Sequence, residues 1–477
     1  MAKTTHIAVI SVPLFSHQSS IIELCKRLIH LHKYIHITCI FPTIDAPIPA
    51  TLKLLESLPP SINCTFLPSI NKQDLPHDVV LEIELAVVLS MSSLRNSLRL
   101  LCSTSTCTPV SALVVDPFAS QALEIAKDLN LLSFVYFPLS AMGTSLFLHL
   151  PTLHEQVSGE YKDHTNPIQI PGCIPIRGQD LPPEFFHDRS SPAYGVFLQH
   201  SNNLSLAHGF LVNSFSKLEA STVRALQKMH NNSTELVYLV GPIIQNGSKS
   251  IDESNGSVCL KWLENQTPST VLYVSFGSAC TLSQQQINEL ALGLELSGQK
   301  FLWVLREPSN SINVGNHSAT NDHDDPLKFL PQGFLERTKE QGLVVPFWAP
   351  QTQILSHAST GGFLTHCGWN STLESLVFGV PTITWPLFSE QRMNAILLEG
   401  LGVGLKVRFN ENGIAERDEI AKVIRELMMG EERSEIRQRI EDLKDAAAGA
   451  LAEDGSSTMA LSLFGTQMKN LSLYNEI

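Results

Sequence analysis

Residues 348–391 read WAPQTQILSHASTGGFLTHCGWNSTLESLVFGVPTITWPLFSEQ, and this stretch of 44 residues decides how the rest of the chain is interpreted. A short apolar strand is predicted at 362–364, and it runs into His366. Helical spacing of apolar residues begins after Asn370 and Ser371. A strand that ends in small polar residues before a helix leaves free backbone N–H groups at the helix start, which suits phosphate. Asn or Ser is also an ordinary helix N-cap, so these residues alone equally allow a plain strand–helix unit.

Taken whole, the stretch closely resembles the signature box of plant family 1 UDP-glycosyltransferases, which move a sugar from a UDP-sugar onto a small acceptor. The match runs through all 44 positions without a gap, from the W-A-P-Q start through H-C-G-W-N-S and Glu374 to the closing Glu390 and Gln391. A signature of this length is far more specific than a lone glycine-rich turn. The resemblance implies the α/β fold called GT-B, in which two doubly wound Rossmann-like domains face each other across a cleft.

The composition favours a large globular protein and argues against a nucleic-acid partner. A chain of 477 residues suggests two or three domains, and 43% apolar against 17% charged residues allows a large core. The formal net charge is −13, whereas nucleic-acid binders are usually basic. The overall field therefore does not attract an anionic sugar nucleotide, and its binding must rest on local donors such as helix starts.

The cysteines and the apolar runs bear on location. Nine cysteines are scattered without a CxxC pair, as reduced thiols of a cytosolic protein would be. Residues 6–12 form a strand-length apolar run and not the core of a secretory signal. No apolar run reaches the ~18 residues that span a membrane. We therefore expect a cytoplasmic protein without stable membrane insertion, and a monomer.

The first half of the chain has the pattern of a doubly wound sheet. A buried strand at 6–12, a helical pattern after the loop 13–18 and a second strand at 35–41 give a βαβ order. Ligands of such sheets bind beyond the carboxyl ends of the strands. His17 lies in the first loop, and Asp116 directly follows a later apolar strand.

His17 and Asp116 are candidates for general-base catalysis. Each alone is more often structural, because a loop His is usually solvated and an Asp before a Pro often only turns the chain. The resemblance implies a catalytic His in this loop, paired with an Asp after such a strand, and these two residues match those positions. A buried Asp that accepts from one ring nitrogen fixes the tautomer and stabilises the imidazolium. The family's glycine-rich run is replaced by P-L-F-S at 13–16, so the loop departs from the pattern.

Residues 150–192 are rich in proline and are expected to be irregular. We interpret this segment as part of the acceptor wall, because long loops in compact domains are often functional. Aromatic residues are the candidates for the wall itself, and the alternative is that they fill the core. These candidates are Phe118, Phe137, Phe185, Phe186 and Phe197. Ser140 matches a Ser or Thr that faces the sugar in family members.

The second half repeats the strand–helix order after a polar stretch at 245–255, which we expect to be the interdomain linker. The hydrophilic segment 307–325 contains Asp and His residues whose spacing fits no ordered metal site, so it is expected to be an acidic loop. No metal and no cofactor are predicted, and the UDP-sugar is a donor substrate.

The resemblance implies which residues of the second half bind the donor. Trp348 stacks on uracil, Glu374 accepts from the ribose hydroxyls, the His366 region surrounds the diphosphate, and the end of the box faces the sugar. The donor-binding residues so implied are Ser278, Trp348, Ala349, Gln351, His366, Trp369, Asn370, Ser371, Glu374, Glu390 and Gln391.

These observations predict the organisation and the reaction. Residues 1–244 are expected to bind the acceptor, 245–455 to bind the UDP-sugar, and 456–477 to form a helix that packs back on the first domain. The implied reaction is inverting transfer of glucose from UDP-glucose to a hydroxyl of a small phenolic acceptor, as in the hydroquinone- and phenylpropanoid-type glucosyltransferases. C- or N-glycosyl transfer and another UDP-sugar stay open. An oxidoreductase would show a complete G-x-G-x-x-G after the first strand, and a sugar-nucleotide binding protein without activity would lack the His–Asp pair.

Overall fold

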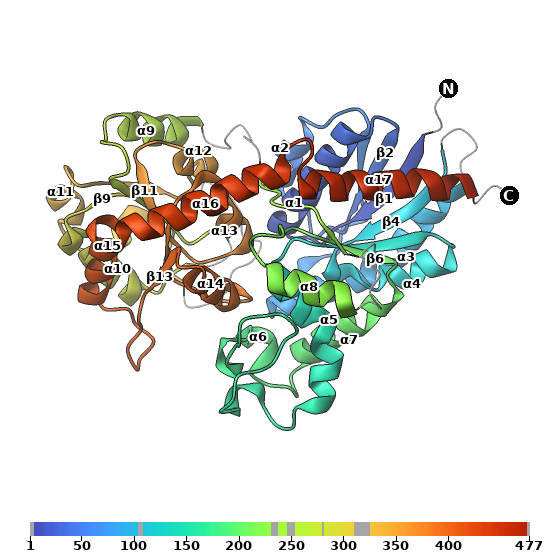
Figure 1. Ribbon diagram of the computed structural model, residues 1–477, viewed down its shortest axis with the longest axis horizontal. Coiled ribbons are helices and arrows are strands. Elements are labelled where there is room, and N and C mark those ends of the chain that lie inside the picture. Colours follow the sequence, from blue (N-terminus) through green and yellow to red (C-terminus); the bar gives the residue numbers. More distant parts are fainter. Residues whose placement is uncertain are drawn as a thin grey trace. The chain divides into compact units, whose positions relative to one another are not determined.

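The computed structural model describes residues 4–103, 108–229, 237–245, 253–278, 281–309 and 325–474. The chain divides into two compact units. The first contains Met1–Gln245 together with Ala448–Ile477, and the second contains Asn246–Ala447. Each unit is a parallel sheet whose strands are joined through helices (Figure 1), so the predicted class of two doubly wound α/β domains is confirmed.

The first unit is built on a seven-stranded parallel sheet in the order β3-β2-β1-β4-β5-β6-β7. Its apolar, β-branched runs are largely buried, as expected where helices cover both faces of a parallel sheet. The order reverses direction between β1 and β4, and ligands of doubly wound sheets bind beyond the carboxyl ends at that point. The strands are β1 (Thr5–Ile10), β2 (Ile35–Phe41), β3 (Ile62–Phe66), β4 (Val110–Val115), β5 (Leu132–Phe137), β6 (Gly209–Val212) and β7 (Val237–Leu239).

Helices of the first unit connect these strands. The longest, α3 (Val79–Ser103), was not predicted, and the segment 150–192 that we expected to be irregular carries short helical turns as well as loops. The helices are α1 (Phe15–Leu31), α2 (Pro49–Leu55), η1 (Lys72–Asp74), α3, η2 (Pro117–Ala119), α4 (Ala122–Asp128), α5 (Ala141–Gln156), η3 (Tyr161–Asp163), η4 (Gly178–Asp180), α6 (Pro183–Phe186), α7 (Pro192–Asn203), η5 (Leu204–Leu206) and α8 (Ala220–Met229).

The last helix, α17 (Ser456–Tyr474), belongs to the first unit and packs against its sheet near β1, β4 and β7 (Figure 1). Phe464 is fully buried and meets the ring of Phe134 edge-on at 5.0 Å. The ring of His32 contacts the carbonyl oxygen of Ser462 through Nε2 at 3.1 Å, and a Cβ at Gly465 would lie 2.3 Å from that ring. Apolar burial and this close approach hold the C-terminal helix on the first unit.

The second unit has a six-stranded parallel sheet in the order β10-β9-β8-β11-β12-β13. Its order reverses between β8 and β11, so their carboxyl ends mark a second ligand position. The strands are β8 (Val271–Ser275), β9 (Lys300–Leu305), β10 (Gly342–Pro346), β11 (Thr360–Thr365), β12 (Thr382–Thr384) and β13 (Gly404–Lys406). The helices are α9 (Glu253–Glu264), α10 (Gln284–Ser297), η6 (Pro326–Phe329), α11 (Phe334–Arg337), α12 (Gln351–Leu355), α13 (Trp369–Phe378), α14 (Gln391–Gly400), α15 (Arg417–Met429) and α16 (Arg433–Leu451), which ends within the first unit.

Two expectations for the second half fall wholly or partly outside the described residues. Most of the predicted acidic loop, 310–324, is not described, and neither are 246–252 of the predicted linker. The end of that linker is helical, since α9 begins at Glu253.

Candidate active site

His17 and Asp116 meet at the switch point of the first sheet. β1 and β4 are parallel neighbours, and Asp116 continues β4 with a backbone N–H that donates to the carbonyl of Ile10 at 2.9 Å. His17 lies in the first turn of α1, and its Nδ1 is 2.7 Å from Asp116 Oδ2. The other carboxylate oxygen accepts from the backbone N–H of Phe118 at 3.0 Å. The carboxylate is therefore held at both oxygens, and the imidazole is oriented by one of them.

Exposure differs sharply across this pair. The side chain of Asp116 is 1% exposed and that of His17 is 12% exposed. An Asp that accepts from Nδ1 leaves Nε2 of the imidazole to take a proton. The loop before His17 reaches this geometry without the glycines of the family pattern, because none of residues 13–16 has a positive φ.

Phe118 is the aromatic ring beside the imidazole. It is half-buried, and its centroid lies 5.7 Å from that of His17. The other predicted wall residues form the layer behind it: Phe137, Phe185, Phe186 and Phe197 are all buried. These four rings pack in the core, as the alternative interpretation of them has it, and Phe118 is the candidate that keeps part of its surface exposed.

Ser140 is also buried, and its hydroxyl accepts from the backbone N–H of Gly143 at 3.0 Å as the N-cap of α5. The carboxylate of Glu219 accepts from the next two free N–H groups, those of Ala141 and Met142, each at 2.8 Å. Burial raises the pKa of Glu219, while these donors oppose the rise. In this structure the Ser140 hydroxyl is the N-cap of α5.

A second imidazole–carboxylate pair also lies beside Phe118, and sequence reasoning missed it. His200 is buried, with Nε2 2.8 Å from Glu84 Oε2 and Nδ1 2.8 Å from the hydroxyl of Ser120. Its ring meets Phe118 edge-on at 5.8 Å. The residues are far apart in sequence and lie within helical segments or turns, so no local pattern marks them.

In the second unit, His366 follows β11 and is enclosed by two glycines. A Cβ at Gly277 would lie 2.6 Å from the imidazole, and so would a Cβ at Gly368. Burial lowers the pKa of His366 to about 4, so the ring is neutral at pH 7. Its Nδ1 is buried and has no hydrogen-bond partner among the residues that the structure describes. The turns after β8 and β11 are therefore in contact through a neutral imidazole.

Helix α13 begins beside this ring at Trp369. Its N-cap is Gly368, which has no side chain to bond the first N–H groups. Asn370 therefore lies inside the first turn and is not the N-cap, which corrects that alternative. A helix start carries a partial positive charge that favours phosphate, and here no N-cap side chain bonds to it.

Glu374 lies one turn further along α13, in a buried network. Nε2 of Gln351 donates to Glu374 Oε2 at 2.7 Å and to the hydroxyl of Ser371 at 2.9 Å. The hydroxyl of Tyr273 reaches Gln351 Oε1 at 3.4 Å. Burial raises the pKa of Glu374 to about 7, against the opposing hydrogen bond from Gln351. Because burial removes water from this carboxylate, hydrogen bonds donated by a ligand would take the place of the missing water contacts.

The remaining box residues frame this region within the second unit. Trp348 is half-buried and Ala349 is buried directly before α12, while Trp369 is buried at the start of α13. Gln391 is buried, and its Oε1 accepts from the N–H groups of Leu387 and Phe388 at 2.9 and 3.1 Å.

Left-handed backbone conformations mark the same loops. Phe347, Cys367 and Ser389 have φ values of 63°, 64° and 54°. Each stands next to, or within two residues of, a predicted donor residue: Trp348, Trp369 and Glu390. Such strained backbone in non-glycine residues is typical of functional sites.

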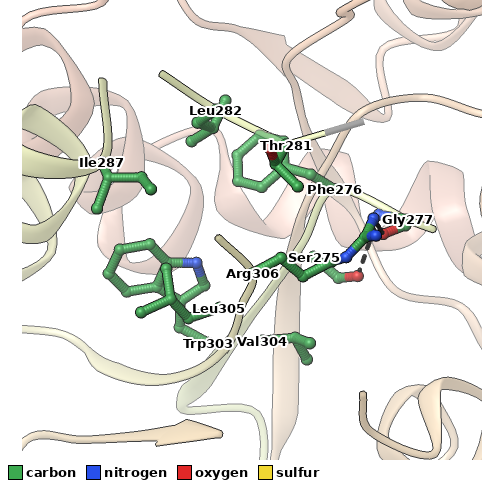
Figure 2. A pocket seen from close by; sticks show the side chains of 10 residues that line it. All are labelled: Ser275, Phe276, Gly277, Thr281, Leu282, Ile287, Trp303, Val304, Leu305 and Arg306. Atoms are coloured by element: carbon green, nitrogen blue, oxygen red, sulfur yellow. Dashed lines mark hydrogen bonds between the residues drawn. The ribbon is translucent and has the colours of Figure 1, made fainter. Parts of the chain in front are cut away.

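The turn after β8 carries Gly277 and Ser278, and Arg306 after β9 reaches it (Figure 2). Nη1 of Arg306 donates to the carbonyl of Ser278 at 2.6 Å and to that of Gly277 at 3.4 Å. A small pocket lined by Thr281, Ile287 and Trp303 among others lies beside this contact. Ser278 is exposed, as a ligand-facing residue must be.

Within the described ranges, no group of three or more His, Cys, Asp or Glu side chains is arranged to hold a metal ion. The Asp322-His323-Asp324 run lies outside those ranges. No helix in the described part of the chain has both the length and the apolar character to cross a membrane.

Comparisons with known proteins find similar sequences over almost the whole chain. A family model described as UDP-glucoronosyl and UDP-glucosyl transferase matches residues 256–436. Hydroquinone glucosyltransferase of Rauvolfia serpentina is 45% identical over 98% of this chain and 99% of its own length. UDP-glycosyltransferase 72B1 of Arabidopsis thaliana is 44% identical over 98% of this chain and 97% of its own length.

Solved structures give the same picture at the level of the fold. The structure of Phytolacca americana UGT2 complexed with UDP-2fluoro-glucose and pterostilbene aligns with a TM-score of 0.88 and 42% identity, covering 98% of this chain and all of that chain. A UDP-glucosyltransferase from Polygonum tinctorium capable of glucosylating indoxyl, in complex with 3,4-dichloroaniline, aligns with a TM-score of 0.88 and 44% identity at the same coverage.

Proposed function

Because the chain belongs to the UDP-glucoronosyl and UDP-glucosyl transferase family and is therefore a UDP-glycosyltransferase, we propose that it transfers glucose from UDP-glucose to the hydroxyl of a small phenol. The observation that carries this proposal is the contact of 2.7 Å between His17 Nδ1 and Asp116 Oδ2. It supplies an oriented base, which a protein that only binds sugar nucleotides does not need.

The reaction assigns one step to each group. Nε2 of His17 takes the phenolic proton, and Asp116 stabilises the imidazolium that forms. The phenolate oxygen attacks the anomeric carbon of glucose, the new C–O bond forms with inversion, and the bond from that carbon to the phosphate oxygen breaks. UDP leaves with the electron pair of the broken bond. The uncapped start of α13 is proposed to stabilise its charge.

A phenol suits this base better than an aliphatic alcohol. The reference pKa of His is ~6.5 and that of a phenol such as Tyr is ~10, whereas an alkanol is far less acidic. Phe118 lies 5.7 Å from the imidazole and offers a ring for offset or edge-on contact with the acceptor. The names of the relatives support the same class, since they include hydroquinone and pterostilbene.

The donor side is proposed to use the second unit. Trp348 stacks on uracil, Glu374 accepts from the ribose hydroxyls, and His366 with Ser371 and Ser278 surrounds the diphosphate. Ala349, Gln351, Trp369, Asn370 and Glu390 complete this site. Gln391 favours glucose over galactose, because family members that end the box in Gln tend to use glucose.

The test is transfer from UDP-glucose to a matched panel, read by mass spectrometry. The panel contains a simple phenol, a flavonoid, a cinnamyl alcohol, a fatty alcohol, a sterol and 3,4-dichloroaniline. We expect phenolic hydroxyls to lead in kcat/KM by at least about tenfold, which is ~1.4 kcal/mol of transition-state binding. A sterol or fatty alcohol at the top would refute the acceptor class, a leading aniline would favour N-glycosyl transfer, and a higher kcat/KM with UDP-galactose would refute the donor.

Variants of the base test the mechanism separately. His17→Ala should lower transfer by about 10²–10⁴-fold while UDP affinity stays unchanged, since general-base help is of that size. Asp116→Asn should also cripple transfer, through loss of the tautomer restraint. His30→Ala is the matched control, because His30 lies exposed on the same helix α1. A His17→Ala enzyme that retains more than about a tenth of the rate would remove His17 from this role.

A further inference from the structure

The turn after β8 is held from two sides in the second unit. On one side the His366 ring lies against Gly277, which has a φ of +71° and no room for a Cβ. On the other side Arg306 crosses from the end of β9 and donates from Nη1 to the carbonyls of Gly277 and Ser278 (Figure 2). Neither contact is local in sequence, and together they fix how the peptide groups of the turn point.

The orientation of these peptide groups decides where their donors face. The bond between Gly277 and Ser278 is trans, because the single cis bond among the described residues is Gly241-Pro242. In a trans peptide the C=O and the N–H point in opposite directions. Since the guanidinium of Arg306 binds the carbonyl of Gly277, the N–H of Ser278 points away from Arg306.

The turn after β8 lies beside the start of α13, so its N–H donors and those of the helix can bind the same ligand. β8 and β11 are parallel neighbours, with Ser275 paired to Thr365, so their carboxyl ends lie side by side. The chain after β11 leads through His366 to the uncapped start of α13. The N–H of Ser278 and the helix start thus belong to neighbouring loops at the same edge of the sheet, at the switch point where a phosphate group binds.

The positive charge of Arg306 is a second way in which this residue favours the binding of a diphosphate. The whole chain carries −13, and the neutral His366 brings no positive charge to this edge. A guanidinium stays protonated in proteins, so Arg306 brings a permanent positive charge to within hydrogen-bond distance of the turn. Beside a diphosphate such a charge stabilises both the bound donor and the negative charge that develops on the leaving UDP.

We propose that Arg306 is the positioning residue of the diphosphate site: it orients the Gly277–Ser278 turn so that its donors face the phosphates, and it supplies the positive charge behind them. This inference rests on the proposed donor site and adds to it a residue outside the signature box. Arg306 acts through the turn and does not itself touch the sugar.

Calorimetry on the full chain at one pH separates this role from a purely structural one. UDP, UMP and uridine are the ligands, and Arg306→Met, Arg306→Gln and Arg306→Lys are the variants. Arg306→Met should weaken UDP binding about tenfold and uridine binding less than about twofold, because the effect is confined to the phosphates. Lysine retains the charge, so Arg306→Lys should stay within about threefold of the parent for UDP.

A matched control is Arg425→Met, since Arg425 also donates to a backbone carbonyl, that of Leu296 at 2.9 Å, on an exposed part of the same unit. It should leave all three affinities unchanged. If Arg306→Met does not fold, Arg306→Gln carries the same test, because its amide can still donate to the turn but has no charge. Equal loss of UDP and uridine affinity, or an unchanged UDP affinity, would overturn the proposal. Failure of the parent enzyme to glucosylate any phenol would instead refute the proposed function, and it would leave these binding results readable.

Discussion

Replacing Glu374 by Gln should stabilise the folded protein at alkaline pH while weakening donor binding. Glu374 is 7% exposed, and burial raises the pKa of its carboxyl from 4.5 to about 7. Between pH 4.5 and pH 7, an acid with a raised pKa binds more protons in the folded state than in the unfolded state. The free energy of unfolding therefore falls as pH rises from 4.5 to 7, and the full loss persists above pH 7.

The size of this effect follows from the shift. At 1.36 kcal/mol per pKa unit, the buried charge lowers the free energy of unfolding by roughly 3 kcal/mol at pH 8 and by less than about 1 kcal/mol at pH 5. A Gln side chain has the same shape, and its amide oxygen can still accept from Gln351. Glu374→Gln should thus raise the melting temperature by on the order of 5–10 °C at pH 8 and by little at pH 5.

Donor binding should move in the opposite direction. A carboxylate accepts stronger hydrogen bonds from two ribose hydroxyls than an amide does, and each difference is about 1 kcal/mol, so affinity for UDP-glucose should fall by about 10–30-fold. In the parent enzyme that affinity should also weaken below pH 7, as Glu374 becomes protonated, whereas the variant should show no such dependence. UDP-glucose is the suitable probe, because its diphosphate has no group that titrates near pH 6–7, whereas a terminal phosphate has one.

Thermal melts at pH 5 and 8 check the change in stability, and calorimetry of UDP-glucose binding over the same pH range checks the change in donor affinity. Glu431→Gln is the control, because that side chain is exposed on the same unit and should change neither quantity. If Glu374→Gln is no more stable than its parent at pH 8, the ionised Glu374 does not destabilise the folded protein as argued. Unchanged affinity for UDP-glucose would remove Glu374 from the donor site.

Three further outcomes are expected. Gly277→Ala should weaken UDP binding at least about tenfold, because its Cβ would lie 2.6 Å from the His366 ring. The control Gly413→Ala has a similar left-handed φ and nothing within 4 Å, so it should leave UDP affinity unchanged. Equal loss of UDP affinity in the two variants, measured by calorimetry, would contradict the argument. Phe118→Ala should raise the acceptor KM about tenfold and leave the KM for UDP-glucose alone, and steady-state kinetics in which only the donor KM moves would place the ring elsewhere. Transfer should persist in EDTA, because His17 removes the acceptor proton and the start of α13 stabilises the leaving diphosphate, so that no metal ion is required for either role. Activity that is lost in EDTA and restored by Mg²⁺ or Mn²⁺ would show that a metal is needed.

Much of the fold could be predicted from local pattern alone. Apolar runs of strand length, followed by helical spacing, indicated two doubly wound halves, and the 44-residue box indicated the family before any geometry was known. Parallel strands buried on both faces carry continuous apolar runs, which is why this signal is strong. Helix α3 was missed, and its apolar positions are mixed with Ser residues, of which Ser90 is buried.

The candidate site was predictable only where its residues belong to a short contiguous motif or end a strand. Asp116, His366 and Glu374 meet that condition, whereas His17 lies in the first turn of the helix after the first strand and was proposed from its place in the family pattern. The sequence could not show that Ser140 caps a helix, because capping depends on where the chain enters that helix.

By itself the sequence determined the family, the two-domain α/β class and which residue types stand at the strand ends, since these follow from local patterns of burial and chain reversal. Only the tertiary structure decided which rings are buried behind Phe118, that Arg306 binds the turn after β8, and that the carboxyl of Glu374 has a pKa near 7. Burial and contact between residues far apart in the chain depend on how whole elements pack. A pKa or a turn orientation is set by that packing and is not written in any local run of residues.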